Sequence, residues 1–469
     1  MTGSSIASDR TASGNANTGP LTGVGSQASK RTGQYLCAPA SDRRSMDSDA
    51  RWYTDHTKLN SFLGYRYVID DWEIPEWIHE VTGDLIDVDS TAALLDRGAE
   101  ALETAFDHAL ADVESGAVHV VPLSAGYDSR TILAELTERV DTANIRCVTY
   151  GTPGGFNYEI APQVADAAGV EHHRIDLTPG EYDWTVDGLV REARTQTTPS
   201  SLFGDNGVLQ SFFETVDEST AEPCYLWSGY LGGESGGAHL DPSVDSWADA
   251  VDSFLALNYQ HDNLTAPEFE PQSVLPDEPL CDPATLRYEE QLDYGIRQQH
   301  YIDTHTDPHE KTPFTDPAWL GFAFNIPYEM RVGQDVYERL LLETHPSLFE
   351  LPTARTNGLP ITAPTWRQKL QWLAKIVLPY GIQQLSVDLR HPMLMHFDKN
   401  NALRHNPHLR SLVKELLASL DRRDLLGWIE IDRLLPAHRR PLNFENYGWE
   451  ILVLASLEIH IRAVERQAE

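Results

Sequence analysis

The spacing of apolar positions changes along the chain and divides it into four parts. Residues 1–48 are rich in Ser, Gly, Thr and Asn, which predicts a disordered segment. Residues 49–112 bring aromatic side chains in strand-like stretches and then helical spacing over 91–112, as expected of a cap or linker. Residues 113–284 alternate short apolar runs with helical segments, and residues 285–469 have mostly helical spacing.

The alternating part predicts a parallel sheet. Short apolar runs predict strands at 118–123, 145–150, 171–177 and 224–229, and the spacing between them predicts helices at 129–140 and 158–169. Strands that alternate with helices are typical of parallel sheets with crossover helices. The predicted fold is therefore α/β, with a doubly wound, mainly parallel sheet and a helical C-terminal region, in which 331–344, 403–419 and the amphipathic 447–465 are the clearest helices.

One turn in this pattern is a candidate phosphate-binding site. The strand at 118–123 runs into "SAGYDS", where small residues let the backbone expose successive N–H groups at the start of a helix. Such a turn can bind a phosphate or pyrophosphate. Asp128 would repel that anion unless a cation lies between them, so the turn suggests Mg²⁺ bridging protein and nucleotide. The turn is neither a G-K-[ST] loop nor a G-x-S-x-G elbow, and by itself it could be an ordinary strand–helix connection.

Charge and composition exclude several classes of protein. The formal net charge is -35, from 71 Asp and Glu against 36 Lys and Arg, and the acidic residues are spread along the chain. This favours an acidic surface adapted to high salt over one that binds basic partners, and it argues against nucleic acid as a partner. Four dispersed cysteines indicate free thiols rather than a zinc site or disulfides. Without an apolar run of membrane-span length or a signal-peptide pattern, we expect a cytoplasmic protein with no membrane partner.

Several motifs in order resemble the synthetase domain of the asparagine synthetase family, an ATP pyrophosphatase (PP-loop) type of domain. "SAGYDS" resembles its pyrophosphate loop S-G-G-x-D-S, and "VTYG" (148–151) resembles the element beside adenine. "SGYLGGESGG" (228–237) is similar to its S-G-x-G-x-D-E motif, and "KTPFTDPAWLGFAFNIP" (311–327) to its R-x-P-F-x-D segment. The resemblance spans roughly residues 52–465 and implies an adenine nucleotide alpha hydrolase-like fold, with ATP and Mg²⁺ as cofactors.

The resemblance also implies roles for individual residues. Asp128 falls at a metal ligand, and Glu234 is expected to serve as a metal ligand and a catalytic residue. Lys375 or Lys369 would be the lysine that offsets charge in the transition state, although both could be surface residues of one helix. The expected nucleotide-binding residues are Leu123, Ser124, Gly126, Asp128, Ser129, Tyr150, Ser228 and Gly229. Leu123, Tyr150 and Gly229 could instead be ordinary core or turn residues.

The chain departs from the family pattern at four places. Residue 2 is Thr where the family has the nucleophilic Cys of its glutaminase domain, so no glutaminase half is expected. Ala125 replaces a loop Gly, which is tolerated only if its φ is negative. In the later motif Tyr230 stands where a catalytic Glu is often found and Gly233 where a metal-ligand Asp is expected. No lysine aligns cleanly with the catalytic one.

These observations predict an ATP-dependent amide-forming ligase. It would activate a small-molecule carboxylate as an acyl-adenylate, release pyrophosphate, and pass the acyl group to an amine or ammonia. A separate amidotransferase subunit is an alternative source of the nitrogen. The alternative is a catalytically impaired nucleotide-binding relative with a structural or regulatory role. An RNA-modifying pyrophosphatase fits the acidic composition poorly.

Overall fold

The computed structural model describes residues 51–83, 85–87, 90–178, 182–196, 198–204, 206–299, 309–374, 397–440 and 446–468. All of these belong to one compact unit that spans Tyr35–Glu469. The disorder predicted for 1–48 and the candidate Lys375 lie outside the described residues. The four-part division of the chain stays a prediction.

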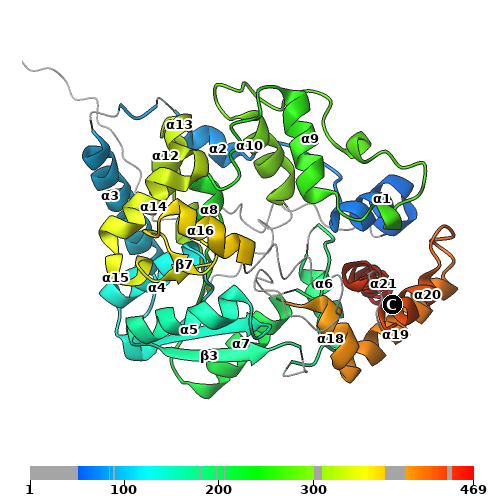
Figure 1. The fold of residues 1–469 in the computed structure, drawn as a ribbon. Helices are drawn as coiled ribbons and strands as arrows, with labels where there is room; N and C mark the ends of the chain where they lie inside the picture. Colours follow the sequence, from blue (N-terminus) through cyan, green and yellow to red (C-terminus); the bar gives the residue numbers. More distant parts are fainter. Residues whose placement is uncertain are drawn as a thin grey trace, which may run out of the picture. The chain divides into compact units, whose positions relative to one another are not determined.

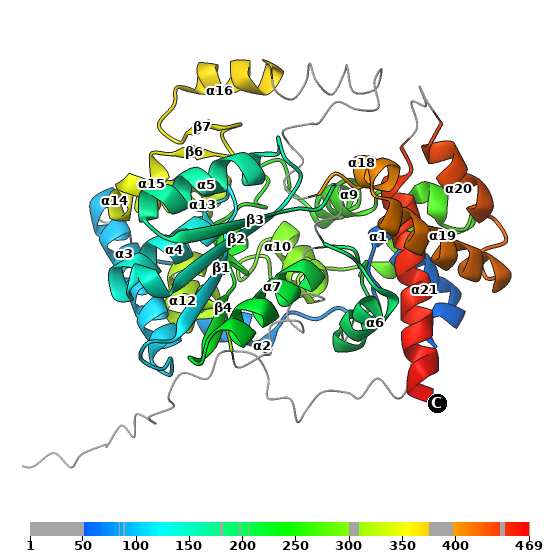
Figure 2. The same ribbon diagram turned by 90° about the horizontal axis from the view of Figure 1, so that it is seen from below.

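A parallel sheet of five strands is the centre of the fold and confirms the doubly wound α/β prediction. Its order is β3 (Glu171–Asp176), β2 (Ile145–Gly151), β1 (Val118–Pro122), β4 (Cys224–Trp227) and β5 (Glu310–Lys311) (Figure 2). Every neighbouring pair is parallel, and Val120 lies opposite Arg146 of β2 and Leu226 of β4. The chain thus builds outward from β1 to β3 and returns to the other side of β1, so the strand order reverses between β1 and β4.

Helices pack along the sheet and form a helical C-terminal region (Figure 1). After β1, α4 (Asp128–Arg139) buries Ile132, Leu133 and Leu136 in the main core. α5 (Phe156–Ala168) packs against β2 and β3, and α7 (Asn206–Ser219) against β2 and β4. The other described helices of the first half are α1 (His56–Tyr65), α2 (Glu76–Val81), α3 (Thr91–Leu110), α6 (Val186–Thr195), α8 (Gly232–Ser235) and α9 (Trp247–Asn258).

The second half adds α10 (Tyr288–Leu292), α12 (Pro317–Phe324), α13 (Tyr328–Arg331), α14 (Asp335–Thr344), α15 (Pro346–Phe349), α16 (Thr365–Trp372), α18 (Lys399–His405), α19 (Pro407–Arg422), α20 (Ile431–His438) and α21 (Gly448–Ala468), with a hairpin of β6 (Pro352–Thr353) and β7 (Leu359–Pro360). α21 contacts α19 and α6 and lies in a second core. It is not the amphipathic helix expected at 447–465, because every residue from Ile451 to Ile461 is buried. Its polar residues are satisfied inside, as Glu458 is by Arg423 and Arg462.

Other expectations differ from the structure near helix ends. The aromatic stretch expected to be strand-like, residues 59–78, forms no strand: 59–65 belong to α1 and 76–78 to α2. Asp55 caps α1 by accepting from the N–H groups of Thr57 and Lys58. The helix expected at 331–344 begins only at Asp335, because Gly333 and Gln334 both have positive φ. The helix expected at 403–419 is two helices, since Asn406 caps α19.

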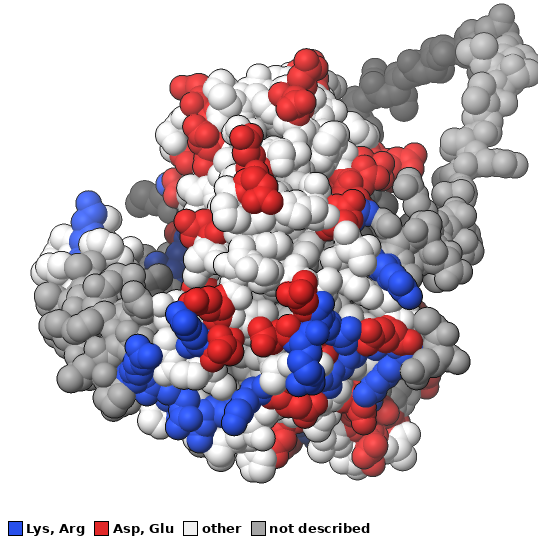
Figure 3. Space-filling model, turned by 90° about the vertical axis from the view of Figure 1, so that its right-hand side faces the viewer, with Lys and Arg blue, Asp and Glu red and all other residues white. Residues whose placement is uncertain are grey.

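Surface charge is uneven in the described part of the chain. Figure 3 shows one face on which Lys and Arg side chains gather in the lower half beside Asp and Glu, in spite of the net charge of -35. Among the described residues no helix has the length and apolarity needed to cross a bilayer. The described cysteines, Cys147, Cys224 and Cys281, are free thiols, as predicted.

Candidate functional site

The two motifs singled out by sequence follow the two neighbouring strands at which the sheet order reverses. The loop from Leu123 to Tyr127 leaves the carboxyl end of β1, and Ser228–Leu231 leaves the carboxyl end of β4. β1 and β4 are hydrogen-bonded neighbours. Ligands of doubly wound sheets bind at this kind of position, outside the carboxyl ends at the switch point.

Two serines fold the first loop onto itself. The Ser124 N–H donates to Ser129 Oγ at 3.0 Å, and the two hydroxyl oxygens lie 2.9 Å apart and share a hydrogen bond. The Gly126 N–H donates to Ser124 Oγ at 3.0 Å. Ser124 and Ser129 therefore set the shape of the loop, and each hydroxyl keeps capacity for a further hydrogen bond.

Ala125 fits the loop in spite of replacing a glycine. It is fully buried and is not among the described residues with positive φ, so its methyl group carries no backbone strain. Its N–H donates to Asn157 Oδ1 at 3.0 Å, and its carbonyl accepts from the Ala354 N–H at 3.1 Å. Sequence reasoning missed Asn157, which lies on α5 and belongs to no recognisable spacing pattern.

The start of α4 has no side-chain cap. α4 begins at Asp128, and Tyr127 at its N-cap provides no side-chain hydrogen bond. The first N–H groups of a helix have no partner within the helix, and the helix dipole adds positive potential there. These N–H groups can hold a phosphate group.

Asp128 packs against the second motif at distances that only glycine permits. A Cβ atom on Gly232 would lie 2.7 Å from Asp128 Cγ, and one on Gly229 would lie 2.9 Å from Asp128 Cβ. Neither glycine has a positive φ, so the reason for glycine is space rather than backbone conformation. Between them Leu231 has a φ of 65°, a costly value for a branched residue that is typical of functional loops. The structure thus brings Asp128, Ser129 and Gly229 together.

The carboxyl group of Asp128 is electrostatically perturbed. Burial, and then the charge of Glu234, raise its pKa to about 7. The hydrogen bond from the Tyr337 hydroxyl to Asp128 Oδ1, 3.0 Å long, and one from the Gly233 N–H oppose this rise. A carboxyl with a raised pKa beside a candidate phosphate site can be ionised by a nearby cation. Tyr337, on α14, was not identified from the sequence.

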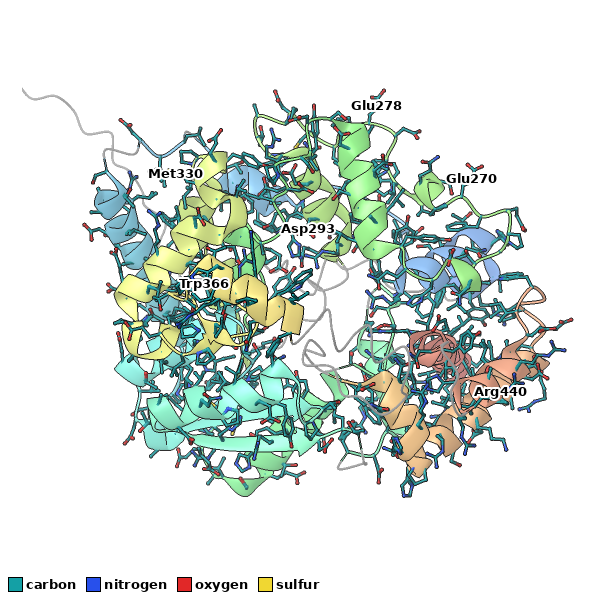
Figure 4. The ribbon with its side chains drawn as sticks, in the orientation of Figure 1. Glu270, Glu278, Asp293, Met330, Trp366 and Arg440 are labelled. Carbon is teal, nitrogen blue, oxygen red and sulfur yellow. The ribbon has the colours of Figure 1, made fainter. Side chains whose placement is uncertain are left out.

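Glu234 is a carboxylate held by two basic groups. Burial opposes its ionisation, but the hydrogen bond with His239 and the charge of Arg297 outweigh it and lower the pKa to about 2. His239 Nε2 and Arg297 lie 3.5 and 3.4 Å from Glu234 Oε1. Arg297 also forms an ion pair with Asp293, which is labelled in Figure 4. Glu234 is therefore a fixed negative charge beside Asp128.

Mg²⁺ fits the side chains present, but only together with a nucleotide. Among the described residues no group of three or more His, Cys, Asp or Glu could hold a metal ion by itself. Mg²⁺ in nucleotide sites takes one or two carboxylates and completes its shell with phosphates and water. Asp128 and Glu234 supply that number of carboxylates, and the charge of Glu234 influences Asp128.

The remaining predicted residues vary in their surroundings. Leu123 is 2% exposed in the main core, and its carbonyl accepts from the Thr149 hydroxyl, whereas Tyr150 is only partly buried. The Ser228 N–H donates to the Lys311 carbonyl at 2.9 Å, which fixes the start of the second motif. Lys369 lies exposed on α16, the helix that carries the labelled Trp366 in Figure 4.

The hairpin of β6 and β7 brings Arg355 to the first loop. Ala354 N–H binds the carbonyl of Ala125, as described above, and Arg355 follows at once in the chain. The guanidinium donates to Glu338 Oε1 at 3.1 Å and to the Gly333 carbonyl at 2.7 Å, with 38% of the side chain exposed. Its charge is a minor influence that lowers the pKa of Asp128, where burial dominates. Arg355 is a cation close to the loop that sequence reasoning missed.

Comparison with known proteins gives one local similarity. No family model matches the chain. A stretch of 93 residues is 29% identical to 7-cyano-7-deazaguanine synthase of Staphylococcus saprophyticus, covering 20% of this chain and 39% of that enzyme. The chain thus spans well under half the length of this relative. The similarity supports a distant relationship at the level of the PP-loop superfamily and gives asparagine synthetase no separate support.

Proposed function

We propose that the protein is an ATP-dependent ligase of PP-loop type that forms an amide bond. The observation that carries the proposal is the contact between Asp128 and the glycines 229 and 232, because it joins two motifs at the switch point of a doubly wound sheet. The distant similarity to a synthase supports the general class. The acyl-adenylate route and the amide product rest on the resemblance to the asparagine synthetase family.

The first proposed step activates a carboxylic acid. A carboxylate oxygen of the substrate attacks the α-phosphorus of ATP, the bond from that phosphorus to the bridging oxygen of the β-phosphate breaks, and pyrophosphate leaves. In the second step an amine or ammonia attacks the acyl carbon, AMP leaves with the former carboxylate oxygen, and the nitrogen loses a proton to solvent. Both steps depend mainly on position and charge stabilisation.

The residues of the site suit these tasks. The N–H groups at the start of α4 would hold the departing pyrophosphate, and Ser124 and Ser129 keep the loop in that shape. Asp128 and Glu234 would hold Mg²⁺, which neutralises phosphate charge when it is bound. Arg355 would add positive charge at the loop, a task assigned in the sequence analysis to Lys375.

Exchange of label between pyrophosphate and ATP tests the first step. We expect exchange that depends on Mg²⁺ and on one class of carboxylic acid, and that falls by at least about a hundredfold in Asp128→Asn, since it removes a charge needed in the transition state. The matched control is Asp107→Asn, in which the lost carboxylate is 71% exposed and pairs with Arg139. Hydroxylamine in place of the amine should yield a hydroxamate.

A second candidate function is nucleotide binding without catalysis, and two residues favour it. Tyr230 donates its hydroxyl to the Gln298 carbonyl at 3.4 Å and cannot act as the carboxylate that often stands there in the family. Gly233 offers no side chain where a metal-ligand Asp is expected. ATP binding that Asp128→Asn weakens, with neither exchange nor hydroxamate for any acid in a broad panel, would establish this function instead.

A further inference from the structure

Two cations lie over the ring of one partly exposed tryptophan. Lys399 Nζ is 3.2 Å and Arg66 Cζ 4.7 Å from the ring centroid of Trp449. Lys399 begins α18, Arg66 ends α1 and Trp449 is at the start of α21, so three distant segments converge (Figure 1). Arg66 has a left-handed φ of 72° because it caps the C-terminus of α1, where its N–H donates to the Phe62 carbonyl.

A buried histidine adds a ring nitrogen that has no hydrogen-bond partner among the described residues. His261 is 5% exposed, and its ring centroid is 6.3 Å from that of Trp449. Its Nε2 atom makes no hydrogen bond to any described residue. Burial, and then the charge of Arg66 with a smaller effect of Lys399, lower the pKa to about 4, so the ring is neutral near pH 7. A neutral imidazole can donate one N–H, and a buried polar atom ordinarily has a partner.

The cluster is attached to the ligand-binding edge of the sheet. The Asp398 N–H, immediately before Lys399, donates to Thr152 Oγ1 at 2.9 Å. Thr152 directly follows β2, at the same carboxyl edge from which the two nucleotide motifs extend. A ligand held here would therefore approach the site from the end of β2.

The chemistry of the cluster selects an anion. Lysine and arginine have no acceptor for a metal cation, and together with a histidine N–H they present donors of one kind. Asp262 is a carboxylate whose charge opposes that of Arg66 and Lys399 at His261. Two cations at one ring, beside a buried ring nitrogen with no hydrogen-bond partner among the described residues, form a geometry suited to an anion.

We propose that Arg66, Lys399 and His261, with Trp449 as a wall, form a subsite for a second anionic group on the acid substrate. The substrate class is then an acid that carries a carboxylate or phosphate in addition to the carboxylate that is activated. This inference rests on the proposed function for the identity of the ligand, whereas the anion subsite itself rests only on the geometry of the cluster.

The exchange assay with matched acids tests the substrate class. Glutarate and 3-phosphonopropionate would be compared with butyrate, which has one anionic group. We expect Lys399→Gln to raise the KM of the dianionic acids by about tenfold or more, the usual effect of losing one charge-assisted hydrogen bond. The KM for ATP and the response to butyrate should stay unchanged. Lys414→Gln, at an exposed position of α19, is the control, and Lys399→Arg should retain most of the preference.

Direct binding keeps the inference testable if no acid supports exchange. Calorimetric titration of glutarate and 3-phosphonopropionate into the full chain should show binding that weakens by about tenfold in Lys399→Gln. Loss of exchange with retained binding would count against the proposed function alone. The subsite would be overturned if the wild-type protein and folded Lys399→Gln bound the dianionic acids with equal affinity. It would also be overturned if mono- and dianionic acids were used equally well while ATP still binds.

Discussion

The raised pKa of Asp128 makes the stability of the unliganded protein depend on pH in a defined direction. Its folded value of about 7 lies above the ordinary value of 3.8, because burial and Glu234 disfavour the charged form. The protonated carboxyl is therefore favoured by folding. Its stabilising contribution is complete below about pH 3.8 and is lost as the pH rises through about 7.

Replacement by asparagine isolates this contribution. Asp128→Asn keeps an acceptor for the Tyr337 hydroxyl but does not titrate, although its amide group changes the contact with Gly233 by a constant amount. The free energy of unfolding of the wild-type protein, relative to the variant, should fall between pH 4 and pH 8. One pKa unit corresponds to about 1.4 kcal/mol, so the fall should be on the order of 2–4 kcal/mol after solvent screening.

Urea unfolding at constant salt and at half-unit steps of pH measures the difference. The exposed control Asp107→Asn should run parallel to the wild-type protein over the whole range. Parallel curves for wild-type and Asp128→Asn, or a difference that grows with pH in favour of the wild-type protein, would refute the argument that burial dominates at Asp128.

Three further substitutions test the loop contacts. Gly232→Ala should lower the free energy of unfolding by about 1–3 kcal/mol and abolish ATP binding, because its Cβ would lie 2.7 Å from Asp128. The control Gly321→Ala has open space around it and should be neutral or slightly stabilising when both variants are unfolded with urea. Tyr337→Phe removes the hydroxyl that favours the ionised form of Asp128. The affinity for ATP, measured by calorimetry with Mg²⁺, should therefore fall several-fold at pH 7 and recover near pH 9. An equal loss of affinity at both pH values would contradict this role. Arg355→Gln should weaken ATP binding by roughly tenfold with partial recovery in Arg355→Lys, and unchanged affinity in both variants would exclude a role in phosphate binding.

The sequence was informative where a local pattern determines structure. Apolar runs predicted β1, β2 and β4, because the central strands of a parallel sheet are buried on both faces. The edge strand β3 is polar and exposed or half-buried, and it was predicted from its place in the alternation of strands and helices. β5 was missed since Glu310–Lys311 is two residues long and carries no pattern. The helix α21 was predicted but its burial was not. In the sequence Glu458 and His460 indicate a polar face, whereas in the structure Glu458 pairs with Arg423 and His460 with the Ser200 carbonyl.

The candidate site divides in the same way. The loop at 124–129 was found from its small residues and its position between a strand and a helix. Asn157, Tyr337 and Arg355 were not found, because each reaches the loop from a separate element through tertiary packing. The close approach of Gly232 to Asp128 is also a property of packing, so the sequence shows that residue 232 is a glycine but not which residue it contacts.

The pairing of β1 with β4 also determines when the site can form during folding. The two strands pair across about a hundred residues of intervening chain, and Gly229 and Gly232 reach Asp128 only after that pairing. Gly229 and Gly232, the surface against which Asp128 packs, follow β4, whereas α4 precedes it, so a nascent chain that ends before Cys224 lacks that surface. Nucleotide that binds only the finished sheet would then stabilise it by mass action, so that ATP selects completed molecules and protects them from proteolysis.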